Sequence, residues 1–584
     1  MIYPQINPYR DSRDLSGVWN FRKDPASQGI KQGWSRGFSG ARPIKVPSSW
    51  NEQFKDTWDY IGPGWYQKKF NGFKSKENQK VYLRFDSVNY FAEVWLNGVK
   101  LGSHEGGHLP FVFEVTKRLK RTNLLVVRAE GSLKPDRVPP GNVPFDPRDA
   151  FANSFNPPAS FDFFPYCGIQ RPVLLFTVPN ESIKDITVAT DISGTKGKVK
   201  VLIETNASPK TSLKISLRGF EWSVTTGGPN AGGKFESALT IPKAKLWAPG
   251  SPNLYALKIE LVKDNKTVDR LNIPVGVRTV KVDRGRLLLN GKAVFLKGFG
   301  RHEDYPYTGR YLPPKALQED YRNMVWIGAN SFRTTHYPYS EQDMEMADRS
   351  GFLVIDETPA VGLFFKKEGL SKRLKLCRQY VKDMIARDKN HPSVIAWSLA
   401  NEPHSKRSAA KGFFRNLSQL ARSLDKTRPI TLVSYLGAQE ESFKFLDLVC
   451  VNRYFGWYSE PGDLKKAIPR LSKDLDTLYK KFKKPILVTE FGADAIPGSH
   501  ANPPAMFSEE YQAEMIEKYL GVIGKKPYVS GAHVWNLSDF RTAQATHRPN
   551  GMNYKGVFTR EREPKLAAYL LRKFWGKSGK KKSV

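Results

Sequence analysis

Two glutamates, Glu402 and Glu490, each follow an apolar segment of the kind that forms a buried strand. Glu402 follows the run Ile395–Asn401, and Glu490 follows the run Ile486–Thr489. Paired carboxylates suit glycoside hydrolysis, because one can protonate the leaving oxygen while the other attacks the anomeric carbon of the sugar. A single glutamate more often caps a helix or pairs with a lysine, so the prediction depends on a fold that brings the two together.

Residues 281–584 predict such a fold. After the turn pair Asn290-Gly291, strands and helices alternate, beginning with a strand near 294–298 and a helix near 315–326. Eight strands in about three hundred residues predict a (β/α)8 TIM barrel, in which the chemistry lies at the C-terminal ends of the strands. Glu402 then ends the fourth strand and Glu490 the seventh. We therefore expect both carboxylates in one barrel mouth.

The chain before the barrel predicts two β-domains. Residues 1–180 show short alternating segments broken by Gly, Pro and Asn, such as Ala92–Leu96 followed by the turn pair Asn97-Gly98. This spacing predicts a jelly-roll-like β-sandwich. Residues 181–280 continue with period-two segments such as Val199–Glu204, and their length of about a hundred residues is typical of an immunoglobulin-like β-sandwich.

Motifs spread along nearly the whole chain, in this domain order, resemble glycoside hydrolase family 2. The matching stretches are Asn89–Gly98, Gly298–Asp304, Trp326–Tyr339, Val354–Thr358, Ala386–Ser393, Asn452–Tyr458 and Gly556–Arg560. Within that family the chain is most similar to the β-glucuronidases. The resemblance implies a sugar-binding-like first domain. It also implies a retaining, exo-acting double displacement that releases D-glucuronate and an alcohol from β-D-glucuronides.

The resemblance assigns roles to four residues near the strand ends. Glu402 would be the general acid/base and Glu490 the nucleophile. Asn401 would bind the sugar 2-hydroxyl, and the Tyr454 hydroxyl would donate to Glu490, which favours the charged carboxylate. The two carboxyl pKa values should differ, because the acid must be protonated while the nucleophile is ionised. Asn401 and Tyr454 could instead be core polar residues with local partners. The same resemblance places further residues around the sugar: His336, Tyr458 and Trp535.

The substrate prediction depends on the pair Asn553 and Lys555, which follows the eighth strand. It resembles the pair with which β-glucuronidases hold the C6 carboxylate of the sugar. Charge-assisted hydrogen bonds contribute about 1.5–3 kcal/mol each. Two of them predict a preference of about 10² to 10⁴ for a uronide over a neutral sugar. A solvated surface loop is the ordinary alternative, and a β-galacturonide would use the same carboxylate contacts.

Arg548 and one connection depart from the usual family pattern, whereas Asp162 matches it but allows a second interpretation. Arg548 lies five residues before Asn553, where relatives have an arginine four residues before, so the spacing does not assign it a contact with the carboxylate. Asp162 is either a ligand of a sugar hydroxyl or a plain turn residue. The connection after Gly362 is short, whereas some relatives carry a long loop there. This predicts an open mouth that admits large leaving groups, including the end of an acidic oligosaccharide.

The charge balance leaves a rival function open. The chain has 92 Lys and Arg against 57 Asp and Glu, a net charge of +35, which attracts polyanions in general. Apart from the tail over 577–582 the charges are dispersed, and no nucleic-acid motif accompanies them. We expect no specific nucleic-acid partner. A polyanion-binding protein with a vestigial catalytic scaffold is the alternative, and the intact sequences at Glu402 and Glu490 argue against it.

The remaining composition predicts a soluble cytoplasmic protein. There is no run of eighteen apolar residues, and Met1–Arg10 lacks the pattern of a secretory signal. The three cysteines, Cys167, Cys377 and Cys450, show no CxxC spacing, so neither a disulfide framework nor a zinc site is expected. We expect no metal, no organic cofactor and no membrane partner. The family resemblance alone implies a homo-oligomer.

Overall fold

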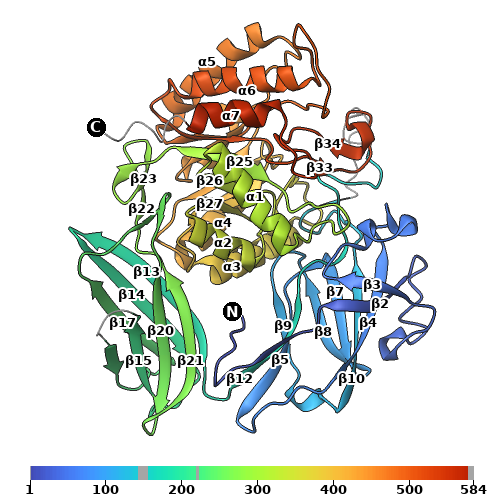
Figure 1. Ribbon diagram of the computed structural model, residues 1–584, viewed down its shortest axis with the longest axis vertical. Helices are drawn as coiled ribbons and strands as arrows, with labels where there is room; N and C mark the ends of the chain where they lie inside the picture. Colours follow the sequence, from blue (N-terminus) through green and yellow to red (C-terminus); the bar gives the residue numbers. More distant parts are fainter. Residues whose placement is uncertain (1, 142–154, 219–222, 577–584) are drawn as a thin grey trace.

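The computed structural model describes residues 2–141, 155–218 and 223–576, which fold into two β-domains and a barrel. In Figure 1 the barrel occupies the upper half, with the N-terminal β-domain in blue below it on the right and the middle domain in green on the left. The fold class predicted from the sequence, two sandwiches followed by a TIM barrel, is confirmed.

The N-terminal domain is a sandwich of two antiparallel sheets. One has the order β1-β12-β5-β9 and the other β3-β2-β4-β10-β7-β8. Asn97 and Gly98, with φ of 54° and 80°, connect β7 to β8, as a tight hairpin turn requires. The strands are β1 Ser12–Asp14, β2 Gly17–Lys23, β3 Arg42–Val46, β4 Pro63–Asn71, β5 Gln79–Phe85, β6 Val88–Asn89, β7 Phe91–Leu96, β8 Val99–Glu105, β9 Phe111–Glu114, β10 Thr122–Glu130, β11 Gly168–Ile169 and β12 Val173–Pro179.

The middle domain is a second, smaller sandwich, with sheets β13-β14-β17 and β16-β15-β20-β21. Buried and exposed residues alternate along β14, because one face of the sheet packs on the other sheet and the opposite face meets water. Its strands are β13 Ile183–Ser193, β14 Lys196–Thr205, β15 Ser212–Leu217, β16 Ser223–Thr226, β17 Lys234–Ile241, β18 Trp247–Ala248, β19 Ser251–Pro252, β20 Tyr255–Lys263 and β21 Lys266–Val275.

Eight parallel strands, β25 to β32, close the barrel. Every residue of β27 is buried, because helices cover the outside and side chains fill the inside. The barrel strands are β25 Leu296–Arg301, β26 Ser331–Thr334, β27 Leu353–Glu357, β28 Val394–Asn401, β29 Ile430–Ser434, β30 Val449–Asn452, β31 Ile486–Glu490 and β32 Val529–Val534. A small three-stranded sheet and a strand pair accompany it. The sheet is β22 Val280–Asp283, β23 Arg286–Leu289 and β24 Lys292–Ala293, and the pair is β33 Phe540–Arg541 and β34 Met552–Asn553.

Helices connect most of the barrel strands, and several begin with a side-chain cap. Ser340, Asp463 and Ser508 accept hydrogen bonds from backbone N–H groups in the first turns of α2, α5 and α6. Between β29 and β30 the chain makes two 3-10 turns instead of an α-helix. The helices are α1 Pro314–Ile327, α2 Glu341–Ser350, α3 Leu370–Asp388, α4 Ser408–Leu424, α5 Leu464–Phe482, α6 Glu509–Ile523 and α7 Leu566–Gly576.

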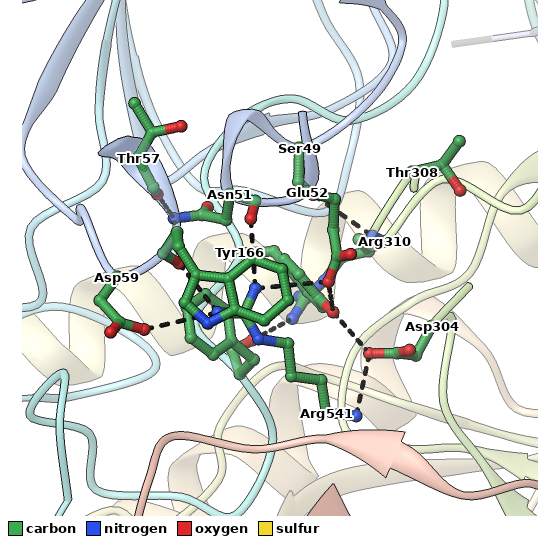
Figure 2. A network of polar contacts seen from close by, with 12 residues as sticks. Ser49, Asn51, Glu52, Thr57, Asp59, Tyr166, Asp304, Thr308, Arg310 and Arg541 are labelled. Atoms are coloured by element: carbon green, nitrogen blue, oxygen red, sulfur yellow. Dashed lines mark hydrogen bonds and ion pairs between the residues drawn. The ribbon is translucent and has the colours of Figure 1, made fainter. Parts of the chain in front are cut away.

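A buried polar network joins the N-terminal sandwich to the barrel (Figure 2). The hydroxyl of Tyr166, from the sandwich, lies 2.8 Å from Glu52 Oε1 and 2.9 Å from Asp304 Oδ2, which follows β25. Arg560 bonds the same two carboxylates. Beside the network, the backbone carbonyl of Arg541, in β33, accepts a hydrogen bond of 2.9 Å from the backbone N–H of Phe164. The chain around Phe164 is therefore fixed to the barrel loops, and this positions a sandwich segment beside the barrel mouth.

Two further properties of the described ranges concern helix hydropathy and the cysteines. No helix within them is long and apolar enough to cross a membrane. Cys167, Cys377 and Cys450 are all buried and free of disulfides.

Candidate active site

A cavity of about 1180 Å³ opens at the C-terminal end of the barrel, and both Glu402 and Glu490 line it. The topology places Glu490 at the end of β31, the seventh barrel strand, and Glu402 directly after β28, the fourth. The sandwich segment containing Asp162 forms another part of the lining. The two glutamates thus share one mouth, as the sequence predicted, and a second domain completes its wall.

Glu490 lies among donors that favour its charged form. Arg333, in β26, donates to Glu490 Oε1 at 2.5 Å, and the Tyr454 hydroxyl donates to Oε2 at 2.8 Å. The ring of His336 stacks on Trp535, and its Nε2 lies 3.8 Å from Glu490. The Glu490 side chain is 6% exposed, so these contacts are made in a setting with little water.

Glu357, the last residue of β27, holds these donors in place. Its carboxylate accepts from Arg333 Nη1 at 2.9 Å and from the Ser398 hydroxyl at 2.8 Å. It also lies 2.8 Å from His336 Nδ1. Burial alone would raise the pKa of Glu357, but Arg333 and His336 lower it, so the group is ionised. Glu357 orients the Arg333 guanidinium and neutralises part of its charge, so Arg333 is not a buried cation without a partner. We call Arg333, His336, Glu357, Tyr454 and Glu490 the nucleophile cluster.

Glu402 has a different set of neighbours. Asn452, at the end of β30, donates its amide to Glu402 Oε1 at 2.7 Å. The amide oxygen of Asn401 lies 3.3 Å from Asn452 Nδ2 and 3.4 Å from Arg333 Nη1. Glu402 itself adopts a φ of 46°. The carboxylate that the sequence assigned to acid/base work therefore accepts from a neutral amide, whereas Glu490 accepts from a cation.

Burial is the largest influence on both carboxyls and raises the pKa of each. It raises the pKa of Glu490 to about 8, together with repulsion from Glu402 and against Arg333 and Tyr454, which lower it. Carboxyls coupled in this way titrate as a pair. Repulsion between the two carboxylates disfavours a state in which both are charged. A single charge is favoured on Glu490, because the guanidinium and the hydroxyl donate there.

The Tyr454 hydroxyl alone does not fix the charge of Glu490. The hydroxyl of Tyr454 was expected to keep Glu490 ionised, and its hydrogen bond does act in that direction. Burial outweighs it, however, so the hydroxyl alone does not set the charge state. Arg333 also lowers the pKa of Glu490, and this contact was not foreseen from the sequence.

Asp162 connects the sandwich to the barrel loops that follow β33. Arg548 donates to both of its carboxylate oxygens, at 2.6 and 2.7 Å, and Asn553 Nδ2 donates to Oδ2 at 2.6 Å. The Asp162 side chain is 34% exposed, whereas that of Arg548 is 4% exposed. Despite its shifted register, Arg548 reaches the cavity and lines it. Asp162 is thus more than a turn residue, since three hydrogen bonds hold it.

Lys555 is buried behind this contact. Its ammonium is paired with Asp494 and lies 3.2 Å from the Tyr458 hydroxyl. Arg548 also lies 3.5 Å from Asp494 and donates to Tyr458 at 3.0 Å. Burial works against an ionised Asp494, but Lys555 and Arg548 lower its pKa. We call Asp162, Tyr458, Asp494, Arg548, Asn553 and Lys555 the wall cluster.

Most residues singled out from the sequence line the cavity: Asp162, His336, Asn401, Glu402, Tyr454, Tyr458, Glu490, Trp535 and Arg548. Asn553 and Lys555 are not among the lining residues. They are 0% and 1% exposed, and they contact Asp162 and Tyr458, which do line it. The surface-loop alternative for this pair is therefore wrong, because both side chains are buried in a polar network.

Sequence reasoning missed four residues that hold the site together: Arg333, Glu357, Asn452 and Asp494. Three of them lie at or next to the end of a barrel strand, in β26, β27 and β30. The rule that barrel chemistry lies at strand ends could have identified these three. Asp494 lies four residues beyond Glu490 in a loop, and no sequence signal marks its contact with Lys555.

Comparison with known proteins agrees with this architecture. The model described as "Glycosyl hydrolases family 2, sugar binding domain" matches residues 12–179, "Glycosyl hydrolases family 2" matches residues 181–278, and "Glycosyl hydrolases family 2, TIM barrel domain" matches residues 280–578.

Relatives resemble the chain over nearly its full length. The chain is 38% identical to a protein of Paenibacillus borealis named beta-glucuronidase, covering 99% of each. A solved beta-glucuronidase from an uncultured Clostridium species has a TM-score of 0.91 at 38% identity, with 99% of this chain and 100% of that chain covered. A Ruminococcus gnavus beta-glucuronidase solved with D-glucaro 1,5-lactone has a TM-score of 0.91 at 34% identity, covering 98% and 99%.

Proposed function

The chain belongs to glycoside hydrolase family 2, and from this premise we propose that it is a retaining exo-β-glucuronidase. It would hydrolyse β-D-glucuronides to D-glucuronate and an alcohol. One observation carries the proposal. The nucleophile cluster and the wall cluster meet at one cavity, and in the wall cluster a cation and an amide, Arg548 and Asn553, bind a carboxylate, that of Asp162. Relatives named beta-glucuronidase support the choice of substrate.

In the first step Glu490 attacks the anomeric carbon while Glu402 protonates the glycosidic oxygen. The alcohol leaves, and the sugar is bonded to Glu490. In the second step Glu402 takes a proton from water, which attacks the same carbon and releases Glu490. The pair begins each cycle with its one negative charge on Glu490, where Arg333 and Tyr454 donate, and with its one proton on Glu402. This is the protonation state that the first step requires.

The wall cluster would bind the sugar carboxylate. In the unliganded protein the Asp162 carboxylate accepts from Arg548 and Asn553, and it stands where a substrate carboxylate could be bound by the same donors. Asp162 is the most exposed member of that contact, so we propose that it turns to the sugar hydroxyls when substrate arrives. Asp494 remains paired with Lys555 and keeps the ammonium in position. Lys555 reaches the cavity through the Tyr458 hydroxyl.

The test is hydrolysis of four matched chromogenic substrates by the purified protein: a β-glucuronide, a β-galacturonide, a β-glucoside and a β-galactoside. We expect the glucuronide to be cleaved fastest by a factor of about 10² or more over the neutral sugars, and NMR to show the β-anomer of glucuronate as first product. Faster cleavage of the galacturonide would show that the protein is a β-galacturonidase instead. An α-anomer as first product would contradict the roles given to Glu402 and Glu490.

Two further properties complete the proposal. We propose a homo-oligomer, by analogy with the family, to be tested by light scattering of the purified protein. We also propose a reducing compartment, the cytoplasm, since Cys167, Cys377 and Cys450 are buried and unpaired. Fractionation of the source cells would test this assignment.

A further inference from the structure

Two short segments bring together the buried ion pair of the wall cluster. Residues 493–495, in the chain after β31, contain Asp494, and residues 554–556, directly after β34, contain Lys555. The ion pair between Asp494 and Lys555 joins the segments through side chains. A backbone hydrogen bond of 2.9 Å, from the N–H of Ala495 to the carbonyl of Tyr554, also joins them. The position of the Lys555 ammonium therefore depends on how firmly the two segments are held together.

Lys565 bridges these two segments. Its side chain is 1% exposed, and its ammonium donates to the backbone carbonyls of Ala495 and Tyr554, both at 2.9 Å. A third hydrogen bond, also of 2.9 Å, goes to Asp539 Oδ1. Because a lysine has three N–H donors, none is left for a ligand. Lys565 is not among the residues that line the cavity, so it can affect the sugar only through the segments that it joins.

Gln512, in α6, bridges the same segments at their other ends. Its side-chain amide donates to the carbonyl of Ala493 at 2.9 Å and to that of Gly556 at 3.1 Å. Gln512 is 0% exposed and is not among the lining residues of the cavity. Lys565 directly precedes α7, and α6 and α7 lie side by side (Figure 1). Both bridges are thus anchored in the helical layer that surrounds the barrel strands.

The two bridges flank the ion pair. In each segment the bridged carbonyls belong to the residues directly before and after the charged one. The N–H of Tyr554 also donates to Asp494 Oδ1, at 2.7 Å. Buried carbonyls require donors, and a role in stability alone would meet that requirement. The placement on both sides of Asp494 and Lys555 does more, because it sets the spacing of the two segments at the pair itself.

The charges next to the bridges have partners. Lys555 and Arg548 lie against Asp494, and Lys565 is paired with Asp539. Burial raises the pKa of the Asp539 carboxyl, and Lys565 lowers it. If the Lys565 cation is removed, Asp539 can take up a proton, so the variant need not contain an unpaired buried charge. Lys565 is therefore open to test by substitution.

We propose that Gln512 and Lys565 are positioning residues for sugar selectivity, which hold Asp494 and Lys555 at the spacing at which the wall cluster binds the sugar carboxylate. The inference rests on the proposed function, since it concerns the carboxylate contacts of a glucuronidase. Neither bridging residue touches the sugar. Without a bridge the two segments move relative to each other, and a displacement of about 1 Å can lower a rate by about 10².

The experiment compares kcat/KM for an aryl β-glucuronide and the matched β-glucoside in the parent enzyme, Lys565→Met, Gln512→Met and Lys555→Met. The glucoside has no carboxylate, so its turnover reports whether the catalytic carboxylates are intact. We expect Lys565→Met to lower the ratio of glucuronide to glucoside kcat/KM by about tenfold, and Gln512→Met by about threefold. The loss should lie mainly in KM for the glucuronide, and inhibition by D-glucuronate should weaken by the same factors.

A double variant tests whether the bridge acts through the ammonium that it positions. In the Lys555→Met background, Lys565→Met should lower the ratio no further, because the positioned group is absent. A further tenfold fall would overturn the proposal, since Lys565 would then act on the sugar by another route. Gln512→Met changes no charge, so it carries the test if Lys565→Met does not fold.

Arg428→Met is the matched control. Arg428 is a buried cation that pairs with Asp425 and donates to the backbone carbonyls of Lys389, His391 and Val394. It precedes β29, at the end of the barrel opposite the cavity. This variant should lower the melting temperature and leave the ratio unchanged.

Two outcomes would overturn the positioning role. One is an equal loss of the ratio in Arg428→Met and Lys565→Met, and the other is an unchanged ratio in both bridge variants. A parent enzyme that does not prefer the glucuronide, or a Lys555→Met variant that keeps the preference, would instead reject the proposed function. The two failures are therefore distinguishable.

Discussion

The nucleophile cluster and the wall cluster hold buried charges in different ways. In the nucleophile cluster, Arg333, Glu357 and Glu490 all belong to barrel strands. In the wall cluster, Asp162 comes from the sandwich and its partners Arg548 and Asn553 come from the chain after β33. The first set is held within the barrel, whereas the contacts of Asp162 in the second exist only while two domains are in contact. Bond cleavage is thus assigned to one domain, and the choice of sugar is shared between two.

The largest effect should come from removing the nucleophile. Glu490→Gln should lower kcat on an aryl β-glucuronide by about 10⁴-fold or more, because an amide cannot form the glycosyl ester. The wall cluster would be intact, so binding of glucuronate, measured by calorimetry, should be retained. Loss of both binding and turnover would indicate that the two clusters are not separable. Turnover within tenfold of the parent enzyme would reject Glu490 as nucleophile.

Removing the buried ammonium should alter the sugar preference. Lys555→Met should reduce the preference for glucuronide over glucoside by about 10², measured as a ratio of kcat/KM. It should also destabilise the protein by about 3–5 kcal/mol, since Asp494 would be a buried charge without its main partner.

A double variant separates the two consequences of that change. Asp494→Asn combined with Lys555→Met removes both charges, so the melting temperature should recover while the sugar preference does not. Recovery of the preference together with the melting temperature would show that Lys555 acts only through stability.

A smaller effect should come from removing the Tyr454 hydroxyl, which tests what sets the charge of Glu490. Tyr454→Phe should lower kcat by about tenfold, the weaker limit for one charge-assisted hydrogen bond. Since the Tyr454 hydroxyl lowers the pKa of Glu490, its loss raises that pKa, and the acidic limb of the kcat/KM profile should move to higher pH. Activity should also decline at alkaline pH, where Glu402, whose pKa is raised by burial, loses the proton that the first step needs. Tyr458→Phe, in the wall cluster, is the control and should raise KM without moving the acidic limb.

The smallest effect concerns the domain contact. Tyr166→Phe removes the hydroxyl between Glu52 and Asp304, while Arg560 still bonds both. The segment that carries Asp162 should be held less firmly, so KM for the glucuronide should rise about twofold with kcat unchanged. Tyr82→Phe, which keeps its stacking on Phe176 within the sandwich, should change neither. A fall in kcat for Tyr166→Phe would mean that the barrel chemistry also depends on the domain contact.

The barrel and its two glutamates were predictable because their signals are local. The helix expected near 315–326 is α1, which spans Pro314–Ile327, because apolar residues recur along it at helical spacing. Glu402 and Glu490 follow from counting strands. Arg333 and Asn452 follow from the same rule and were not singled out, since many polar residues lie near strand ends and spacing alone does not rank them.

The wall cluster was only partly predictable, for a physical reason. Asn553 and Lys555 were recognised through a family resemblance, but their burial depends on contacts with Asp162 and Asp494. The contact between Asp162 and Asn553 spans 391 positions and crosses a domain boundary. Periodicity describes one element at a time, so it carries no information on how loops from two domains meet.

Because β25 pairs with β32, the barrel can close only after the last of its strands has been synthesised. β25 leaves the ribosome long before β32, so one of its edges is unpaired during that time. Asn553, a partner of Asp162, is synthesised later still. A nascent chain that lacks Asn553 therefore cannot have a complete wall cluster. Both glutamates can be present in an unfinished molecule that has not yet acquired the means to choose among sugars.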